Sequence, residues 1–166
     1  QGFTVQAMPS KLFDGVRISS TAIRAALGAG QLATAQRYLG RHYSMSGRVV
    51  HGDKVGRTLG FPTANIQVRH ARLPLSGIYV VCVHSEGLGV LQGVASLGVR
   101  PTVKQNARPV LEVHFLEFEQ DIYGKQLRVE FLQKLRDEEK YPDLATLTRH
   151  IALDVTHAKE WFEKHD

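Results

Sequence analysis

The stretch VLEVHFLEFEQDIYGKQLRVEFLQKL, residues 110–135, carries the pattern that decides the fold. Apolar and polar side chains alternate in each half of it, as they do in a β-strand that has one buried face and one polar face. The apolar positions are Leu111, Val113 and Phe115 in the first half, and Leu127, Val129 and Phe131 in the second. The polar turn between the halves therefore predicts two strands that each place one face against a core.

Three similar runs precede this stretch at short intervals: MSGRVV (45–50), GIYVVCVH (77–84) and VLQGVASLG (90–98). All are rich in β-branched or aromatic residues, and turns containing Gly, Pro or polar residues separate them. Short strands at this spacing are typical of a small antiparallel barrel or sandwich, and they disfavour a doubly wound sheet.

Helical patterns flank the strands on both sides. After Pro142, with Asp143 as the expected cap, apolar residues recur at three- and four-residue intervals and predict one long closing helix. They are Leu144, Leu147, Ile151, Val155, Ala158 and Phe162. Before the strands, Ser20 is expected to cap a short helix that Gly28 and Gly30 end, and a second helix over residues 31–39 is closed by Gly40. Residues 46–166 thus read as one unit, with residues 1–45 as a helical lead-in.

Composition narrows the class of protein. The 166 residues are 43% hydrophobic and 22% charged, which are globular values, and no run is long and apolar enough to cross a bilayer. The single cysteine, Cys82, excludes an intramolecular disulfide and a cysteine-based zinc site. No secretory signal is present, so a cytoplasmic protein is expected. The net charge of +5 is concentrated before residue 110, which suits a phosphate-bearing ligand of any kind.

The segment GRVVHGDKVGRTLGFPTAN, residues 47–65, is the densest candidate for ligand binding. Gly47, Gly52, Gly56 and Gly60 recur every four or five residues, with Lys54 and Arg57 between them. Glycines let a backbone approach a ligand closely and the two cations balance anionic charge, so the composition suits a polyphosphate. The segment matches neither the Walker loop nor the dinucleotide fingerprint, and a glycine-rich hairpin is the competing interpretation.

The segment ends in Pro62, Thr63, Ala64 and Asn65. A hydroxyl and a carboxamide two residues apart can point the same way from an extended backbone, and such a pair could bind Mg²⁺. Few protein ligands are needed where ATP supplies the negative charge. An Asx-type turn would explain the same four residues without a metal.

Glu112 is the candidate general base, because it projects from a strand whose other face is apolar and could accept a proton from a substrate hydroxyl. A solvent-facing strand glutamate is the alternative. His114 lies on the same face and is a rival base. The acidic run of residues 137–139 is interpreted as a solvated turn before the closing helix, in preference to a metal site.

Taken together, these motifs resemble the riboflavin kinase module of the bacterial bifunctional riboflavin kinase/FMN adenylyltransferases, also called FAD synthetases. The similarity extends over nearly the whole chain, and GFPTAN (60–65) followed downstream by the strand LEVHF (111–115) is its most specific part. It implies a mainly β fold, a six-stranded antiparallel Greek-key barrel with a long C-terminal helix. It also implies transfer of the ATP γ-phosphate to the 5′-hydroxyl of riboflavin, which gives FMN and ADP.

The resemblance assigns roles by position. Thr63 and Asn65 would hold Mg²⁺ and the ATP phosphates, and Glu112 would be the catalytic base. The rest of the nucleotide site would come from Gly47, Gly52, Lys54, Gly56, Arg57, Gly60 and Pro62. Arg100, and the region from Arg136 into the closing helix, would border the flavin, whose ring needs an apolar slot beside the barrel.

The front of the chain departs from the bifunctional family, because no HxGH motif of the adenylyltransferase domain occurs in it. Ser19, Ser20, Thr21 and Arg24 match only the last ATP-contacting motif of that domain. Residues 1–45 are therefore expected to be its C-terminal remnant with linker helices, residues 46–166 the kinase domain, and the missing domain its partner in the parent chain. A non-catalytic flavin-binding barrel and a nucleic-acid-binding barrel are the alternatives. The second is disfavoured because residues 46–109 contain only two aromatic residues, Phe61 and Tyr79.

Overall fold

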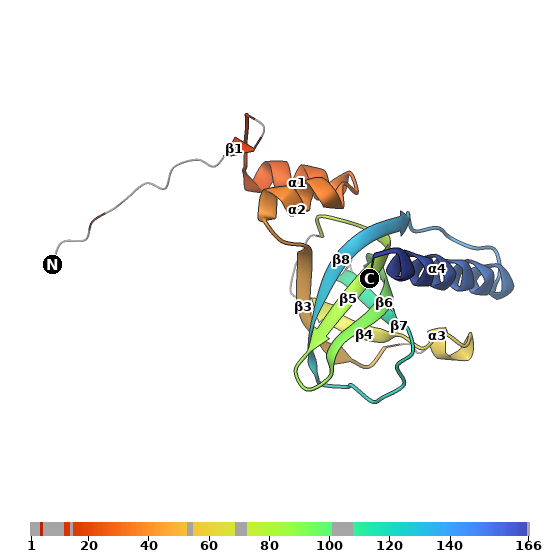
Figure 1. Cartoon of the computed structure of the whole chain (residues 1–166). Helices are drawn as coiled ribbons and strands as arrows, with labels where there is room; N and C mark the ends of the chain where they lie inside the picture. The colour runs from red at the N-terminus through yellow and green to blue at the C-terminus, as the bar shows by residue number, and fades with distance from the viewer. Residues whose placement is uncertain are drawn as a thin grey trace.

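The structure, a computed structural model, describes residue 4 and residues 12–13, 15–52, 55–68, 73–100 and 108–165. Six strands form one closed sheet, short helices precede it and a long helix follows it (Figure 1). The N-terminal elements are β1 (Leu12–Phe13), β2 (Val16–Arg17), α1 (Ser20–Gly28) and α2 (Leu32–Leu39). The barrel region contains β3 (Tyr43–Val50), α3 (Val55–Thr58), β4 (Ala64–Val68), β5 (Gly77–Ser85), β6 (Gly89–Arg100), β7 (Arg108–Phe115) and β8 (Gln126–Arg136), and α4 (Leu144–His165) follows.

The barrel is antiparallel throughout, with the strand order β3-β4-β7-β6-β5-β8 and β8 pairing back onto β3. Strands β5, β6 and β7 follow one another, and β8 returns to lie beside β5, which is a Greek key. The alternating apolar residues of residues 110–135 fill its interior, where Leu111, Val113, Val129 and Phe131 are completely buried. Helices α1 and α2 pack at one end of this core through Leu27 and Ala35.

Helix α4 lies against the outer surface of the barrel beside β5 and β6 (Figure 1). A second apolar cluster joins them, with Ile78 and Val80 on β5, Val94 on β6, and Ala158 and Phe162 on the helix. Because this helix covers only part of the barrel circumference, outward-facing side chains on the neighbouring strands β4 and β7 stay available for a site. No helix among the described residues has both the length and the apolar content needed to cross a bilayer.

The predicted mainly β fold, six-stranded barrel and closing helix are confirmed. The Asp143 side chain caps α4 by accepting a hydrogen bond from the Thr146 backbone N–H at 2.7 Å, and Gly40 ends α2 with φ at 71°. Other details differ from the prediction. Ser19, not Ser20, caps α1 by accepting from the Ala22 N–H at 3.1 Å.

Two further sequence expectations were wrong at the ends of elements. The run VLEVHFLEF (110–118), expected from its composition to be one strand, is a strand only as far as Phe115, where β7 ends, because the chain turns at Glu117, whose φ of 58° is incompatible with a strand. Leu144, placed on the apolar face of the closing helix by its spacing, is 60% exposed as the first residue of α4.

Candidate active site

A row of outward-facing side chains around the barrel forms the base of the site. The strand register pairs Asn65 on β4 with Glu112 on β7, and Glu112 with Ser96 on β6. Directly opposed residues in an antiparallel sheet lie about 4.5–5.5 Å apart, so the register fixes the spacing of these three polar side chains. The sequence places Asn65 and Glu112 forty-seven positions apart, and only the pairing of β4 with β7 brings them together.

An apolar cavity of about 220 Å³ lies between α4 and two residues of this row, Glu112 and Ser96, whereas Asn65 does not line it. Its polar groups include Glu112, Thr63 and His114 on the barrel side. Its apolar wall is made by the barrel and by the first half of α4, through Leu59, Phe61, Ile78, Val94, Leu147, Ile151 and Val155. The cavity therefore offers a flat or ring-shaped ligand apolar contact and places one end of it beside a carboxylate.

A second cavity, of about 490 Å³, opens on the other side of Thr63. It is more polar, with Arg57, Glu119, Gln120 and Asp121 in its wall, and its aromatic residues are Phe115, Phe118 and Tyr123. Thr63 lines both cavities, whereas Glu112 lines only the first and Arg57 only the second. Two ligands bound in the two cavities would consequently meet at the Thr63 side chain.

The predicted ligand-binding glycines have different surroundings. Gly52 lies against Asn65, and a Cβ at position 52 would overlap the Asn65 carboxamide. The Gly56 carbonyl accepts a hydrogen bond from the Phe61 N–H at 2.8 Å, which closes the loop between these two residues. Gly56 also lines the first cavity. Gly60 has φ at 83°, a conformation that favours glycine.

Other predicted residues lie apart from the cavities or outside the described part of the chain. Gly47 faces the barrel interior, where a Cβ would meet the Ile66 side chain and the Gln67 carbonyl. A glycine at this position therefore lets β3 and β4 pack closely. Pro62 lines the second cavity. Lys54 and the side chain of Arg100 lie outside the described residues. The glycine-rich segment is more than a simple hairpin, since the helical turn α3 interrupts the connection from β3 to β4.

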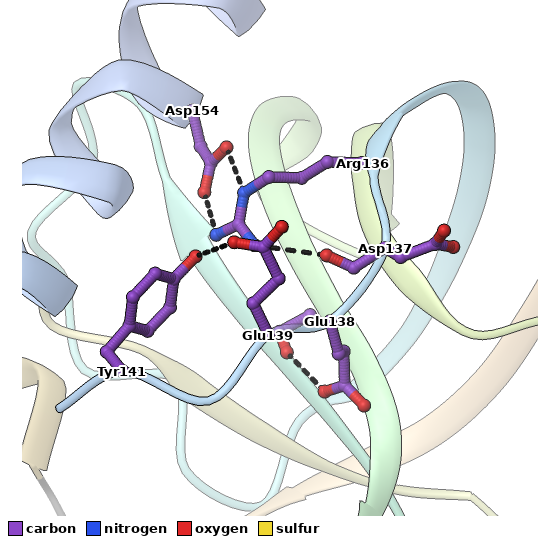
Figure 2. Close-up of polar contacts among 7 residues, drawn as sticks. Arg136, Asp137, Glu138, Glu139, Tyr141 and Asp154 are labelled. Atoms are coloured by element: carbon purple, nitrogen blue, oxygen red, sulfur yellow. Dashed lines mark hydrogen bonds and ion pairs between the residues drawn. The ribbon is translucent and has the colours of Figure 1, made fainter.

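Arg136 holds the end of β8 to α4 at the rim of the first cavity (Figure 2). Its Nε and Nη2 donate to the two carboxylate oxygens of Asp154 at 2.9 and 2.6 Å, and its Nη1 donates to the Asp137 carbonyl at 3.1 Å. The Tyr141 ring lies 5.7 Å from the guanidinium carbon. Burial by itself would lower the pKa of Arg136, but the hydrogen bonds and charge of Asp154 outweigh it and raise the pKa above its ordinary value.

The acidic run 137–139 is exposed, as expected, but it is an irregular segment and not a turn, and each of its carboxylates has a partner, as Figure 2 shows for Glu138 and Glu139. Asp137 pairs with Lys134, Glu138 accepts from the Ser96 hydroxyl at 3.3 Å, and Glu139 accepts from the Tyr141 hydroxyl at 3.2 Å. No group of three or more His, Cys, Asp or Glu side chains suited to a metal occurs in the described ranges. A Mg²⁺ ion that takes few protein ligands and completes its shell with phosphate oxygens does not require such a group.

Thr63 and Asn65 are suited to that arrangement. Both offer oxygen atoms, the donor type that Mg²⁺ prefers, and a cation with few protein ligands completes its shell with water and phosphate oxygens. The glycine at position 52 leaves the space that the Asn65 carboxamide fills. These two residues thus fit a magnesium ion carried in by a nucleotide.

Sequence reasoning missed Asp154, Tyr141 and the second cavity. Asp154 is only 5% exposed on the buried side of α4, among apolar residues whose spacing was the signal for the helix. A buried acid in an apolar stripe implies a cationic partner, and this was the available clue. Arg136, Tyr141 and residues of α4 line the first cavity. That this region borders the flavin stays a prediction from the resemblance.

The closed barrel and the two cavities that adjoin at Thr63 define a small β-barrel protein with two neighbouring ligand-sized cavities. The family model described as Flavokinase, riboflavin kinase, matches residues 39–162. The chain belongs to the riboflavin kinase family.

Relatives agree with this assignment. The chain is 46% identical over 159 residues to the bifunctional riboflavin kinase/FMN adenylyltransferase of Pseudomonas fluorescens, a match that covers 96% of this chain and 51% of the relative. The protein of the same name from Escherichia coli strain K12 is 45% identical over 161 residues, with 97% and 51% covered. The chain thus spans about half the length of the curated relatives it matches.

Solved structures give the same architecture. The crystal structure titled macrolide-efflux protein from Streptococcus pneumoniae superposes with a TM-score of 0.82 and 33% identity, covering 93% of this chain and 50% of that one. The crystal structure of riboflavin kinase from Trypanosoma brucei superposes with a TM-score of 0.51 and 26% identity, covering 73% and 80%.

Proposed function

We propose that this chain transfers the γ-phosphate of ATP to the 5′-hydroxyl of riboflavin, giving FMN and ADP. The observation that carries the proposal is Thr63 as a wall shared by two cavities, with the Glu112 carboxylate on one side only. A phosphoryl transfer needs its donor and acceptor in adjoining sites with a charge-stabilising group between them. Membership of the riboflavin kinase family supplies the identity of the two substrates.

The first cavity suits the flavin. Its apolar side chains from the barrel and from α4 would hold the isoalloxazine ring, and the polar row beneath would face the ribityl chain. In this orientation the terminal hydroxyl points toward Glu112 and Thr63. The second cavity, with Arg57 and its aromatic residues, is left for the nucleotide.

Glu112 would accept the proton of the 5′-hydroxyl as the oxygen attacks the γ-phosphorus. A new phosphorus–oxygen bond forms, the bond from the γ-phosphorus to the β,γ-bridging oxygen breaks, and the electron pair leaves with ADP. Removal of the proton by a positioned base is typically worth about 10²–10⁴ in rate. Most of the remaining barrier is lowered by positioning the two substrates and by neutralising charge.

Thr63 and Asn65 would hold Mg²⁺, which when bound neutralises charge on the β- and γ-phosphates. The Thr63 hydroxyl would face the transferred group because it lies between the two cavities. Asn65, paired across the sheet with Glu112, would keep the phosphate end of the site next to the base.

FMN adenylyltransferase, the second activity in the names of the curated relatives, is proposed only for a longer parent protein. We assign residues 1–45 to the remnant of that domain and residues 46–166 to the kinase domain. No HxGH motif occurs in this chain, as expected of a kinase domain that lacks the adenylyltransferase active site. A cytoplasmic location belongs to the same proposal, because ATP is available there.

The test is to incubate the purified chain with riboflavin, ATP and Mg²⁺ and to separate the flavins by chromatography, with FMN replacing riboflavin in a parallel reaction. We expect FMN from riboflavin and no FAD from FMN. FAD in the parallel reaction would refute the domain division. Riboflavin binding without any product would instead favour a non-catalytic flavin-binding barrel.

A further inference from the structure

His114 connects the strand that carries Glu112 to the segment that carries Thr63. It lies on β7 two residues beyond Glu112, and its Nδ1 is 2.9 Å from the Pro62 carbonyl oxygen, across fifty-two positions of sequence. A carbonyl oxygen can only accept a hydrogen bond, so Nδ1 carries the proton and donates it. This bond fixes the tautomer of the neutral imidazole, with Nε2 unprotonated.

The bond lies where the sheet ends. The ladder between β4 and β7 stops at the pair Ala64 and Val113, and residues 61–63 belong to no strand or helix. The hydrogen bond from the His114 side chain therefore attaches residues 61–63 to β7 just beyond the last backbone pair. The Phe61 ring also meets the imidazole edge-on, with centroids 5.5 Å apart and an interplanar angle of 77°.

These two contacts determine how Thr63 is presented. The Pro62 carbonyl and the Thr63 N–H belong to one planar peptide unit, so anchoring the carbonyl sets the direction in which the Thr63 backbone continues. Thr63 is the residue shared by the two cavities, and in the proposed kinase its hydroxyl would face both ligands. A loss of this anchor would let the hydroxyl rotate away while leaving the barrel intact.

We propose that His114 is a positioning residue for phosphoryl transfer, which holds the Pro62–Thr63 peptide so that Thr63 presents its hydroxyl between the nucleotide and the flavin. The inference rests on the proposed kinase function. His114 lies two residues from Glu112 on the same strand, but its imidazole would act by holding Thr63 in place and would not accept the substrate proton.

Three substitutions separate these roles. In H114N the amide Nδ2 is attached to Cγ, as Nδ1 is in histidine, so it can still donate to the Pro62 carbonyl. In H114Q the amide lies one bond farther out and misses that position, and H114A has no donor. H157N on the exposed outer side of α4 is the matched control, because His157 lines neither cavity.

We expect H114A and H114Q to lower kcat and to weaken Mg²⁺·ADP binding, measured by calorimetry, by about 10–100-fold, the usual cost of losing a group that orients a ligand-binding side chain. H114N should recover most of both losses, and the melting temperatures should stay close to that of H157N. H114N as inactive as H114A, with nucleotide binding intact in both, would make His114 a base and overturn the proposal. Full activity of H114A would also overturn it.

The two measurements distinguish this inference from the kinase proposal itself. If the unmodified chain makes no FMN but binds Mg²⁺·ADP, the kinase proposal fails while the binding series still decides the role of His114. If the unmodified chain does not bind Mg²⁺·ADP, both are overturned.

Discussion

The Arg136–Asp154 pair gives the sharpest test of how α4 is held to the barrel. Replacing Asp154 with Ala removes two charge-assisted hydrogen bonds, of 2.9 and 2.6 Å, and leaves a guanidinium whose side chain is 21% exposed without its anion. Breaking a buried pair by deleting one partner usually costs about 3–5 kcal/mol. In D154A, Arg136 keeps its hydrogen bond to the Asp137 carbonyl, its contact with the Tyr141 ring and some contact with water. We therefore expect a loss of stability at the lower end of this range, about 3 kcal/mol.

A loss of about 3 kcal/mol corresponds to a fall of about 6–12 °C in melting temperature for a chain of this size. The assay is urea unfolding followed by far-UV circular dichroism and by the fluorescence of Trp161, the single tryptophan, which lies on α4 and stacks on His165 at 4.1 Å. Coincident curves would show that helix and barrel unfold together. We also expect the apparent affinity for riboflavin to fall, because both charged residues line the first cavity.

The control is the double variant R136M/D154L, which removes both charges and fills the space with apolar side chains. Replacing a whole buried pair is often close to neutral, so the double variant should be more stable than D154A alone. A double variant as unstable as the sum of its single variants would show that the two side chains are not coupled. That result would refute the reasoning.

Further predictions concern the cavities and the start of α4. E112Q should lower kinase turnover by about 10²-fold or more with ATP binding retained, and unchanged turnover would exclude Glu112 as the base. T63A should weaken Mg²⁺·ATP binding in calorimetry without changing the melting temperature. If Thr63 were purely structural, T63A would change the melting temperature and leave Mg²⁺·ATP affinity unaltered. G52A should displace the Asn65 carboxamide and reduce Mg²⁺·ATP affinity, while G28A at the end of α1, where a Cβ meets only the Pro74 carbonyl at 3.6 Å, controls for the effect of losing a glycine. Hydrogen bonds from the first turn of α4 lower the pKa of Asp143 below its ordinary value of 3.8, so its stabilising effect is present above that pH and is lost as the pH falls through the lowered pKa. The stability difference between the unmodified chain and D143S, followed by urea unfolding, should therefore shrink on acidification, and a constant difference would contradict this.

Much of the fold could be predicted because strand periodicity is a local property of sequence. The alternation in residues 110–135 identified the buried faces of β7 and β8, and Asp143 was identified as a cap from its place after Pro142. The five strongest runs all became strands. The sixth strand, β4, is only five residues long and was interpreted as part of the ligand segment, so its place in the barrel came from the family resemblance and not from its own pattern.

The site was less predictable because it depends on register. Residue types identified Thr63, Asn65 and Glu112 as candidates, but the pairing of β4 with β7 decides that Asn65 lies opposite Glu112. Asp154 could be seen only as a charge in an apolar stripe, since its partner is eighteen residues earlier on β8. Similarly, the shared face of Glu112 and His114 was visible in the sequence, but the contact between His114 and Pro62 was not.

Closure of the barrel determines how well the geometry of the site tolerates insertions and deletions in the loops. The residues Val50, Asn65, Glu112, Ser96, Ile78 and Arg136 are successive cross-strand neighbours that run once around the barrel from β3 to β8. Every strand in this circuit is hydrogen-bonded on both sides, so a slip of one strand would break two ladders at once. The loops that join the strands can consequently gain or lose residues in evolution or by engineering, and the distances among the groups on the circuit would be inherited unchanged.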